Sequence, residues 1–204
     1  DLDGSLDGAF GAGGIVTTDI YGNGDQAGAL VITDDQKIVV ASSSWVDAFD
    51  GPVALARYDS NGTLDSTFGS NGVALFYLST SVVEITDLAL QVDGKLVVAG
   101  NTSNNDAFLI RCGADGEDDP DGFAQPYGWA TAGLLAATRF SALAVQSDGK
   151  LLAAGTMNGE PVEILVVRFQ PDGTLDETFG DSGLAYTYAG GVAAGANAIA
   201  VQPD

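Results

Sequence analysis

One short motif recurs along this chain and constrains its fold more than any other feature. It joins a Leu–Asp pair to Phe–Gly, and its clearest copies are LDGAFGAGG at residues 6–14, LDSTFGSNG at 64–72 and LDETFGDSG at 175–183. A second motif lies between these copies, as LALQVDGKLVVAG at 88–100 and LAVQSDGKLLAAG at 143–155. Self-similarity with a period of about 55 residues indicates a repeat array rather than one irregular domain.

Short apolar segments of β-strand length lie between the motifs. In the second copy they cover residues 73–78, 83–92, 95–102 and 107–112, and they are rich in Val, Leu, Ile and Phe. The Asp93-Gly94 pair predicts a tight hairpin turn, because glycine readily adopts the positive φ that such turns need. Strands joined in this way form an antiparallel meander. The equivalent segments are 15–20, 29–32, 37–44 and 53–58 in the first copy, 134–137, 142–146, 151–156 and 164–169 in the third, and 184–188 and 198–202 in the fourth.

Four strands in every unit of about 50 residues are typical of β-propeller blades. A β-helix needs a far shorter period, and tandem immunoglobulin-like domains need about 100 residues each. We therefore expect an all-β fold in which residues 1–204 form a single β-propeller region of four-stranded antiparallel blades, each of about 55 residues. The expected blades cover about 6–59, 64–114 and 123–171, followed by a partial blade at about 175–204.

The last blade is expected to be incomplete in this chain, because only two of its strands are recognisable. A propeller normally leaves no sheet edge bare. Two explanations stay open: these residues belong to a longer chain, or a neighbouring copy completes the blade.

The combined pattern LDxxFGxxG, QxDGK(L/I)xxAG and (V/L)xR(Y/F)xxxG resembles the bacterial delta-60 repeat, a propeller-like unit of large secreted and surface proteins. The agreement is complete at residues 64–69 and 175–180. It is poorer in the third copy, where residues 123–133 lack the Leu–Asp pair and follow a longer acidic loop, and in the first copy, where Gln36 replaces the turn glycine. The resemblance implies an extracellular or cell-surface scaffold of a bacterium, and it carries over no catalytic residues.

The composition excludes several classes of function. The net charge is −21, from 28 acids and seven bases, so nucleic acid and anionic membranes are poor partners. No apolar run approaches the length of a membrane span. The chain has no histidine, which removes His-assisted nucleophilic catalysis and His-ligated zinc. Its single cysteine, Cys112, occupies the position of Tyr58 and Phe169 in other copies, so we expect a buried core residue.

Acid-rich turns are the candidate metal sites. Residues 59–65 and 172–176 place side-chain oxygens at alternating positions around a glycine, as calcium-binding loops do. The alternative is that these acids close tight turns by side-chain hydrogen bonds to the backbone. No cofactor is required by the sequence, and Ca2+ is kept as a candidate ligand. The candidate ligands in the most acidic loop are Asp115, Asp118, Asp119 and Asp121.

The basic residues follow the repeat. We expect them to form one structural pairing in each blade, with each arginine in a partly buried ion pair with a turn aspartate such as Asp65 or Asp176. A ring of arginines that binds anions is the alternative. Only Arg139 lies outside the pattern. The bases at equivalent positions are Lys37, Lys95, Lys150, Arg57, Arg111 and Arg168.

We do not expect an enzyme. The favoured function is a non-catalytic extracellular scaffold, which presents propeller loops to protein or glycan partners or packs with neighbouring copies into a surface assembly. A calcium-stabilised carbohydrate-binding module is the alternative. A polysaccharide-acting enzyme stands below both, with Glu84, Glu160 and Glu163 as the acids that lie outside the turns.

Overall fold

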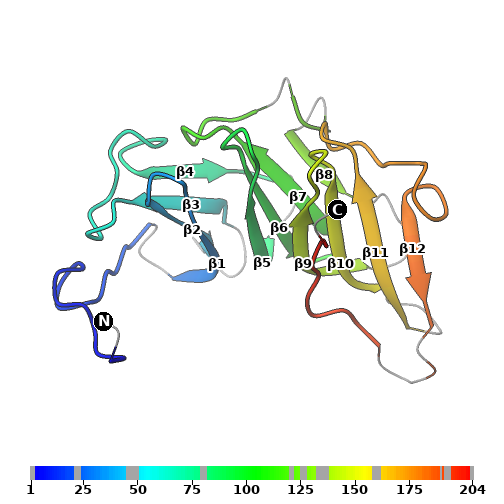
Figure 1. The fold of residues 1–204 in the computed structure, drawn as a ribbon, viewed down its shortest axis with the longest axis horizontal. Coiled ribbons are helices and arrows are strands. Elements are labelled where there is room, and N and C mark those ends of the chain that lie inside the picture. The colour runs from blue at the N-terminus through cyan, green and yellow to red at the C-terminus, as the bar shows by residue number, and fades with distance from the viewer. Residues whose placement is uncertain are drawn as a thin grey trace.

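The computed structural model describes residues 3–20, 24–44, 51–78, 82–119, 122–124, 128–131, 138–157, 162–188, 190 and 194–202. Within these residues it contains twelve β-strands in three four-stranded antiparallel sheets, which stand side by side in an arc (Figure 1). No described residues form a helix that is long and apolar enough to cross a membrane. The expected all-β fold of four-stranded antiparallel units is confirmed.

Each sheet contains four strands that follow one another along the chain. The first sheet consists of β1 (Asp25–Ile32), β2 (Ile38–Ser44), β3 (Val53–Tyr58) and β4 (Val73–Phe76). The second consists of β5 (Val82–Leu90), β6 (Leu96–Thr102), β7 (Ala107–Cys112) and β8 (Trp129–Thr131). The third consists of β9 (Thr138–Val145), β10 (Leu151–Met157), β11 (Glu163–Phe169) and β12 (Leu184–Thr187).

The sheets are offset by one strand from the grouping expected from the sequence. The Leu–Asp–x–x–Phe–Gly turn reverses the chain so that β4 pairs back onto β3, with Ala56 opposite Val73. The strand that follows each turn therefore completes the preceding sheet, and its assignment to the following blade is wrong. The three sheets extend over residues 25–76, 82–131 and 138–187.

Two of the expected strands are not strands in the structure. Residues 15–20 and 198–202 have no ladder partner among the described residues, and an extended segment without a partner forms no sheet. The expected strand at 134–137 lies outside the described residues. The short strand β8 stands in the corresponding position of the second sheet.

The turn between the first two strands of each sheet has one conformation in all three repeats. In the second sheet, Gln91 N donates to Lys95 O and Gly94 N donates to Gln91 O, both at 2.9 Å. Gly94 has a φ of 83°, as expected for a three-residue hairpin loop that closes with a left-handed residue. In the first sheet Gln36 occupies this position with a φ of 64°, so the turn is kept although the glycine is lost.

The first strands of the sheets lie along the inner side of the arc. β1 contacts β5, and β5 contacts β9, while β4, β8 and β12 form the opposite edges of their sheets (Figure 1). The inner side is therefore the place where residues of all three sheets come together.

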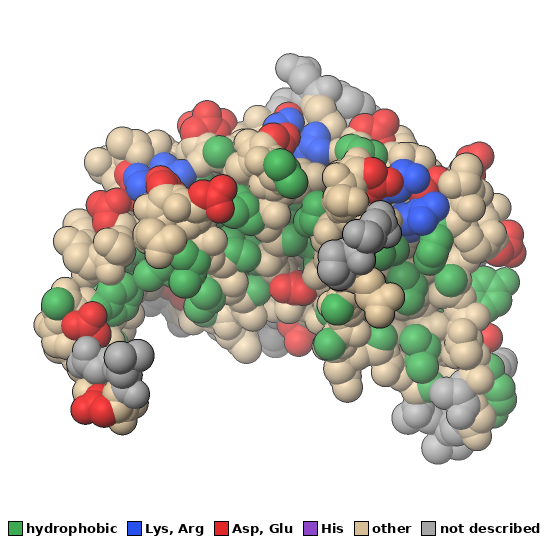
Figure 2. All heavy atoms as spheres, viewed as in Figure 1, with side chains coloured by type: hydrophobic (Ala, Val, Ile, Leu, Met, Phe, Trp, Pro, Cys, Tyr) green, Lys and Arg blue, Asp and Glu red, His purple; other side chains and the backbone are tan. Residues whose placement is uncertain are grey.

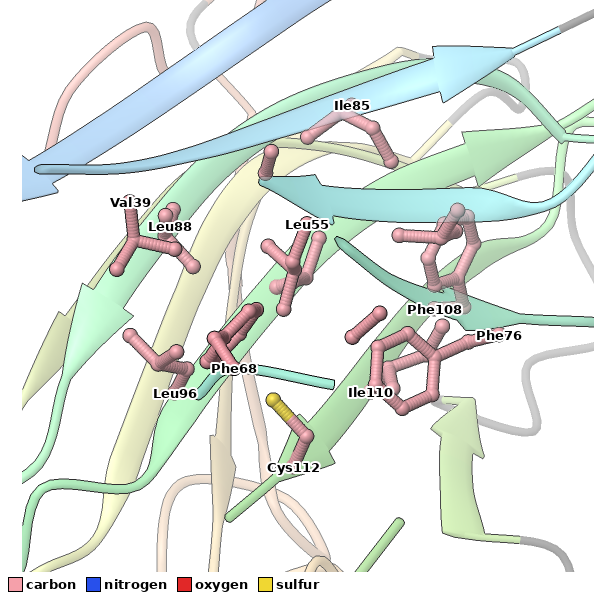
Figure 3. Close-up of a cluster of buried hydrophobic side chains, with 14 residues drawn as sticks. Val39, Leu55, Phe68, Phe76, Ile85, Leu88, Leu96, Phe108, Ile110 and Cys112 are labelled. Atoms are coloured by element: carbon pink, nitrogen blue, oxygen red, sulfur yellow. The ribbon is translucent and has the colours of Figure 1, made fainter. Parts of the chain in front are cut away.

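Adjacent sheets pack face to face, and their apolar side chains form two buried clusters. Successive residues of a strand point to opposite faces, so β6 supplies Leu96 to the cluster shared with the first sheet and Val97 to the cluster shared with the third. Figure 3 shows the first cluster, in which Leu55 and Phe68 meet Leu96. The middle sheet is buried on both faces, which explains why β6 is apolar almost throughout.

Cys112 lies in the first cluster and is 1% exposed. Burial raises the pKa of its thiol to about 12, with nearby acids adding to the effect, so the thiol stays protonated at neutral pH. The expectation that it is a core residue is confirmed.

Candidate functional site

An aspartate in each turn between the third and fourth strands, buried in the first and third sheets and partly buried in the second, binds two basic side chains. In the first sheet, Asp65 Oδ2 accepts hydrogen bonds from Lys37 Nζ at 2.5 Å and from Arg57 Nε at 2.7 Å. Asp65 is 5% exposed. Lysine and arginine come from the ends of neighbouring strands, so one carboxylate fastens the turn to both. The expected ion pair between an arginine and the turn aspartate is confirmed.

The third sheet repeats this arrangement. Asp176 Oδ2 lies 3.0 Å from Lys150 Nζ and 2.7 Å from Arg168 Nε. Figure 2 shows basic and acidic side chains together at three places along the outer edge of the arc, one for each sheet. The bases are thus distributed over the molecule and not gathered into one patch.

Asp119 takes the same role in the second sheet, although the local sequence conceals it. Its Oδ2 lies 2.8 Å from Lys95 Nζ and 2.9 Å from Arg111 Nε. Asp118 forms a β-bridge with Cys112, as Leu64 does with Tyr58, so the acidic loop contains the Leu–Asp turn with its leucine replaced. A sequence signal was present, because arginine and aspartate are eight residues apart in every copy.

These contacts favour the charged form of each carboxyl group. The hydrogen bond from Lys37, then that from Thr67, holds the pKa of Asp65 well below its ordinary value. Burial by itself would raise the pKa of Asp119, but Lys95 and Arg111 outweigh it and leave the pKa lowered. The carboxylates are therefore ionised at neutral pH, and their charge is neutralised in place.

The arginines also connect neighbouring sheets. Arg57 Nη1 donates to the carbonyl oxygen of Ala114, in the turn after β7, at 2.5 Å, and Arg111 Nη1 donates to that of Pro171, in the turn after β11. The Arg57 guanidinium lies 4.6 Å from the centre of the Phe68 ring, which is a cation–π distance. Arg111 is only 6% exposed. This arrangement gives little support to an anion-binding ring of arginines.

The Phe–Gly half of the motif packs against the next sheet. Gly69 N donates to the carbonyl oxygen of Asp115 at 2.7 Å. Phe68 lies against Gly116, where a Cβ atom would come within 2.8 Å of the ring. Ala124 and Phe123 make the same contacts with Asp172 and Gly173 in the third sheet. The motif is thus a joint between consecutive sheets.

The other turn acids close turns. Asp115 Oδ1 accepts a hydrogen bond from Glu117 N at 3.1 Å, and Asp172 Oδ1 accepts one from Thr174 N at 2.9 Å. Such bonds are the usual means by which aspartate stabilises a tight turn. Among the described residues, no group of three or more acids, cysteines or histidines is placed to hold a metal ion.

The four calcium candidates are thus separated by role. Asp115 closes a turn, Asp119 pairs with two bases, and Asp118 is exposed in a bridge to Cys112. Asp121 lies outside the described residues. The structure therefore gives each described candidate a structural contact of its own.

A polar pocket lies where the inner strands of the three sheets meet, and we call it the axial pocket. Its volume is about 590 Å³. Arg139, the base outside the repeat pattern, lies here in an ion pair with Glu84, with Nη2 2.6 Å from Oε2. The two side chains are 36% and 48% exposed, so both remain accessible to a ligand. The sequence singled out each residue but did not predict that they meet.

The walls of the axial pocket are held by hydrogen bonds between sheets. Asn101 Nδ2 donates to the carbonyl oxygen of Phe140 at 3.0 Å, and Phe140 N donates to Asn101 Oδ1 at 2.9 Å. Gln26 and Asn197 are exposed beside the ion pair. The pocket thus combines a fixed rear wall with several polar groups at its mouth.

Three segments of the chain, residues 34–68, 91–121 and 146–179, match a family described as "Domain of unknown function (DUF5122) beta-propeller". These segments are β-propeller repeats. Each begins in the turn after a first strand and ends in or near the Phe–Gly joint, so it contains one complete cluster of lysine, arginine and aspartate. The sheets are propeller blades, and the axial pocket lies on the side of their innermost strands.

No curated protein matches the chain. Among solved structures, a protein of unknown function from Bacteroides caccae has a TM-score of 0.28 and 10% sequence identity, over 80% of this chain and 73% of that one. A likeness at this level carries no argument about fold or function.

Proposed function

We propose that this propeller is a non-catalytic scaffold of the bacterial cell exterior, whose stacked blades hold the axial pocket in place for a glycan or protein partner. The resemblance to delta-60 repeats and the net charge of −21 support the location. The observation that carries the proposal is the position of Arg139. Six of the seven bases are engaged in the turn clusters, while this one lies in an accessible polar pocket.

The chemistry of the pocket suits a polar, uncharged ligand. A guanidinium group donates and a carboxylate accepts, so Arg139 and Glu84 together can bind the vicinal hydroxyl groups of a sugar or a backbone amide of a peptide. Their mutual neutralisation disfavours a ligand of high charge. Gln26 and Asn197 add amide groups that both donate and accept.

Binding of the purified chain to a glycan array, with and without calcium, tests the proposal. We expect Arg139→Gln to weaken binding of any captured glycan about tenfold or more, because it removes charge-assisted hydrogen bonds. Glu177→Gln, an exposed acid in an outer turn, is the matched control and is expected to bind as the parent does. Equal binding by Arg139→Gln would remove the axial pocket from the proposal.

The two alternatives receive less support. Binding that requires calcium would favour the carbohydrate-binding module, but the described turn acids already have structural contacts. Glycoside hydrolysis normally uses two carboxyl groups, and among the described residues that line the axial pocket Glu84 is the one acid. Turnover of a polysaccharide that is abolished by Glu84→Gln would restore the enzyme hypothesis.

A further inference from the structure

The axial pocket is built from the same backbone position in each blade. The first strands β1, β5 and β9 lie next to one another along the inner side of the arc (Figure 1). Each contains a β-bulge at the same place, where one residue is left out of the pairing with the second strand: Gly28, Thr86 and Ser141. All three line the axial pocket. Bulges often lie beside binding sites, where they redirect side chains.

The residue two positions before the bulge differs from blade to blade, and it also lines the pocket. It is Gln26 in the first blade, Glu84 in the second and Arg139 in the third, and we call these three residues the inner layer. The turn clusters behave differently, because each contains a lysine, an arginine and an aspartate. The fold thus fixes the residue types of the turn clusters but not those of the inner layer, which leaves the inner layer free to recognise a ligand.

The side chains that face the axial pocket are polar. Among its described lining residues the large apolar ones are Ile85 and Phe140, and these are only 5% and 0% exposed. Protein partners are normally bound through apolar and aromatic anchors, and the described part of the lining offers none that is exposed. A glycan instead presents hydroxyl groups, each of which can donate and accept. The lining therefore favours a glycan over a protein segment.

The charges of the pocket favour a glycan without acidic groups. Arg139 donates to Glu84 Oε2 at 2.6 Å and to Asn105 Oδ1 at 3.3 Å, so its charge is already compensated. The net charge of −21 repels an anionic polysaccharide. A neutral hydroxyl group can accept from the guanidinium and donate to the carboxylate while the ion pair stays in place. Thr86 Oγ1 donates to Ala99 O at 3.3 Å, which leaves its lone pairs to accept from a second hydroxyl group.

We propose that the axial pocket binds a neutral glycan, and that side chains of three blades hold it at once. The inner layer of Gln26, Glu84 and Arg139 recognises hydroxyl groups at one level, and the bulge residues Thr86 and Ser141 do so two residues further along the strands. The residue types of the inner layer decide which hydroxyl stereochemistry fits, because equivalent backbones place the donors and acceptors. The inference rests on the proposed function and narrows its partner from a glycan or protein to a neutral glycan.

Calorimetry on the full 204-residue chain tests the inference, with neutral hexasaccharides of glucose, mannose, galactose or xylose and with hexagalacturonate as the acidic counterpart. We expect saturable binding of at least one neutral hexasaccharide, and binding of hexagalacturonate at least tenfold weaker. Gln26→Ala, Thr86→Val and Ser141→Ala each change one side chain in a different blade. Each is expected to weaken binding about fivefold, because it removes one neutral hydrogen bond. Thr17→Val, exposed and outside the pocket, is the matched control for Thr86→Val.

A double exchange separates recognition from stability. Glu84→Arg combined with Arg139→Glu keeps an ion pair at the same two backbone positions but exchanges donor and acceptor. Because an exposed ion pair contributes little to stability, we expect the melting temperature to stay within about 3 °C of the parent. Binding of the neutral hexasaccharide is expected to fall about tenfold or more. Unchanged binding by this variant would overturn the inference, since the ion pair would then have only a structural role.

The other failures distinguish the inference from the proposed function. Glycan binding that Arg139→Gln weakens but Gln26→Ala, Thr86→Val and Ser141→Ala do not would overturn recognition by three blades and leave the proposed function in place. Tighter binding of hexagalacturonate would do the same, as would Arg139-dependent binding of members of a random-sequence peptide library without binding of any glycan. Absence of binding to every neutral hexasaccharide would overturn the inference. Glycan binding that Arg139→Gln leaves unchanged would overturn the role of the axial pocket in both.

Discussion

At the scale of single residues, the repeat assigns one structural task to each charged group. Asp65, Asp119 and Asp176 are ionised at the centre of their clusters, and each is neutralised by a lysine and an arginine. The pairing of arginines with turn aspartates was predicted from the sequence, because the basic residues and the turn aspartates recur at equivalent positions of the repeat. It did not predict Asp119, since the acidic loop has one extra residue before Phe123 and hides the alignment.

Gln36 has a left-handed backbone conformation, which is unfavourable for a residue that carries a side chain. Its φ of 64° costs a residue with a Cβ atom roughly 1 kcal/mol relative to glycine. We expect Gln36→Gly to stabilise the protein by about 0.5 kcal/mol, because part of the gain is lost to the greater entropy of glycine in the unfolded chain.

The denaturant midpoint at an unchanged slope measures this effect. Gly94→Gln is the reverse change at the equivalent position, where φ is 83°. It is expected to destabilise the protein by about 1 kcal/mol, because the new Cβ atom would also lie only 3.3 Å from Ala114 Cβ. A lower denaturant midpoint for Gln36→Gly than for the parent would contradict backbone strain at Gln36.

At the scale of elements, the Leu–Asp–x–x–Phe–Gly turn is both the end of one blade and its joint to the next. Its aspartate holds β2 and β3 through Lys37 and Arg57, and its Phe–Gly pair contacts the following blade. The positions of most strands and turns followed from sequence patterns, although β1 and β9 are longer than the segments expected at 29–32 and 142–146. The pairing of β4 with β3 could not be predicted from the sequence, because the repeat period and the composition are the same whether this strand pairs with the preceding or the following blade.

Loss of one aspartate should therefore loosen the turn and its joint together. We expect Asp65→Asn to lower the free energy of unfolding by about 2 kcal/mol, since hydrogen bonds from charged donors are lost in a buried site. The folded pKa of Asp65 lies below its ordinary value of 3.8. Its stabilisation is consequently complete above about pH 4 and is lost as the pH falls further.

Unfolding free energies of parent and variant from pH 6 to pH 2 check both statements. The difference between them should shrink as the pH falls below 4, because the unfolded parent then binds a proton on Asp65 that the folded parent does not bind, which favours unfolding. Glu177→Gln, exposed in the third blade's turn, should leave the whole profile unchanged. If the difference in unfolding free energy between parent and Asp65→Asn stayed constant down to pH 2, the charge of Asp65 would not be the cause of its stabilising effect.

At the scale of the whole molecule, stability depends on stacking, because each blade covers the next. The middle blade is buried on both faces, whereas the first presents Leu30 and Ile32 at 61% and 59% exposure. The chain also carries 28 acids against seven bases, so the compact state bears a strong self-repulsion.

Screening of this repulsion should stabilise the propeller without a specific metal. We expect the melting temperature to rise between low salt and about 0.5 M NaCl, where the Debye length falls to only a few Å. CaCl2 and MgCl2 at equal ionic strength should act alike, and EDTA should have no effect. A saturable increase at micromolar calcium, absent with magnesium, would instead identify a calcium site among the turn acids.

Periodicity alone determined the fold class, most of the strands and the regular turns of this protein, because a repeated pattern restricts every copy to the same local structure. Tertiary structure alone decided to which blade each strand after the turn belongs, that Glu84 meets Arg139, and that Asp119 binds Lys95 and Arg111. Those outcomes depend on contacts between segments far apart in the chain. A sequence pattern does not specify which of several equivalent repeats a residue will contact.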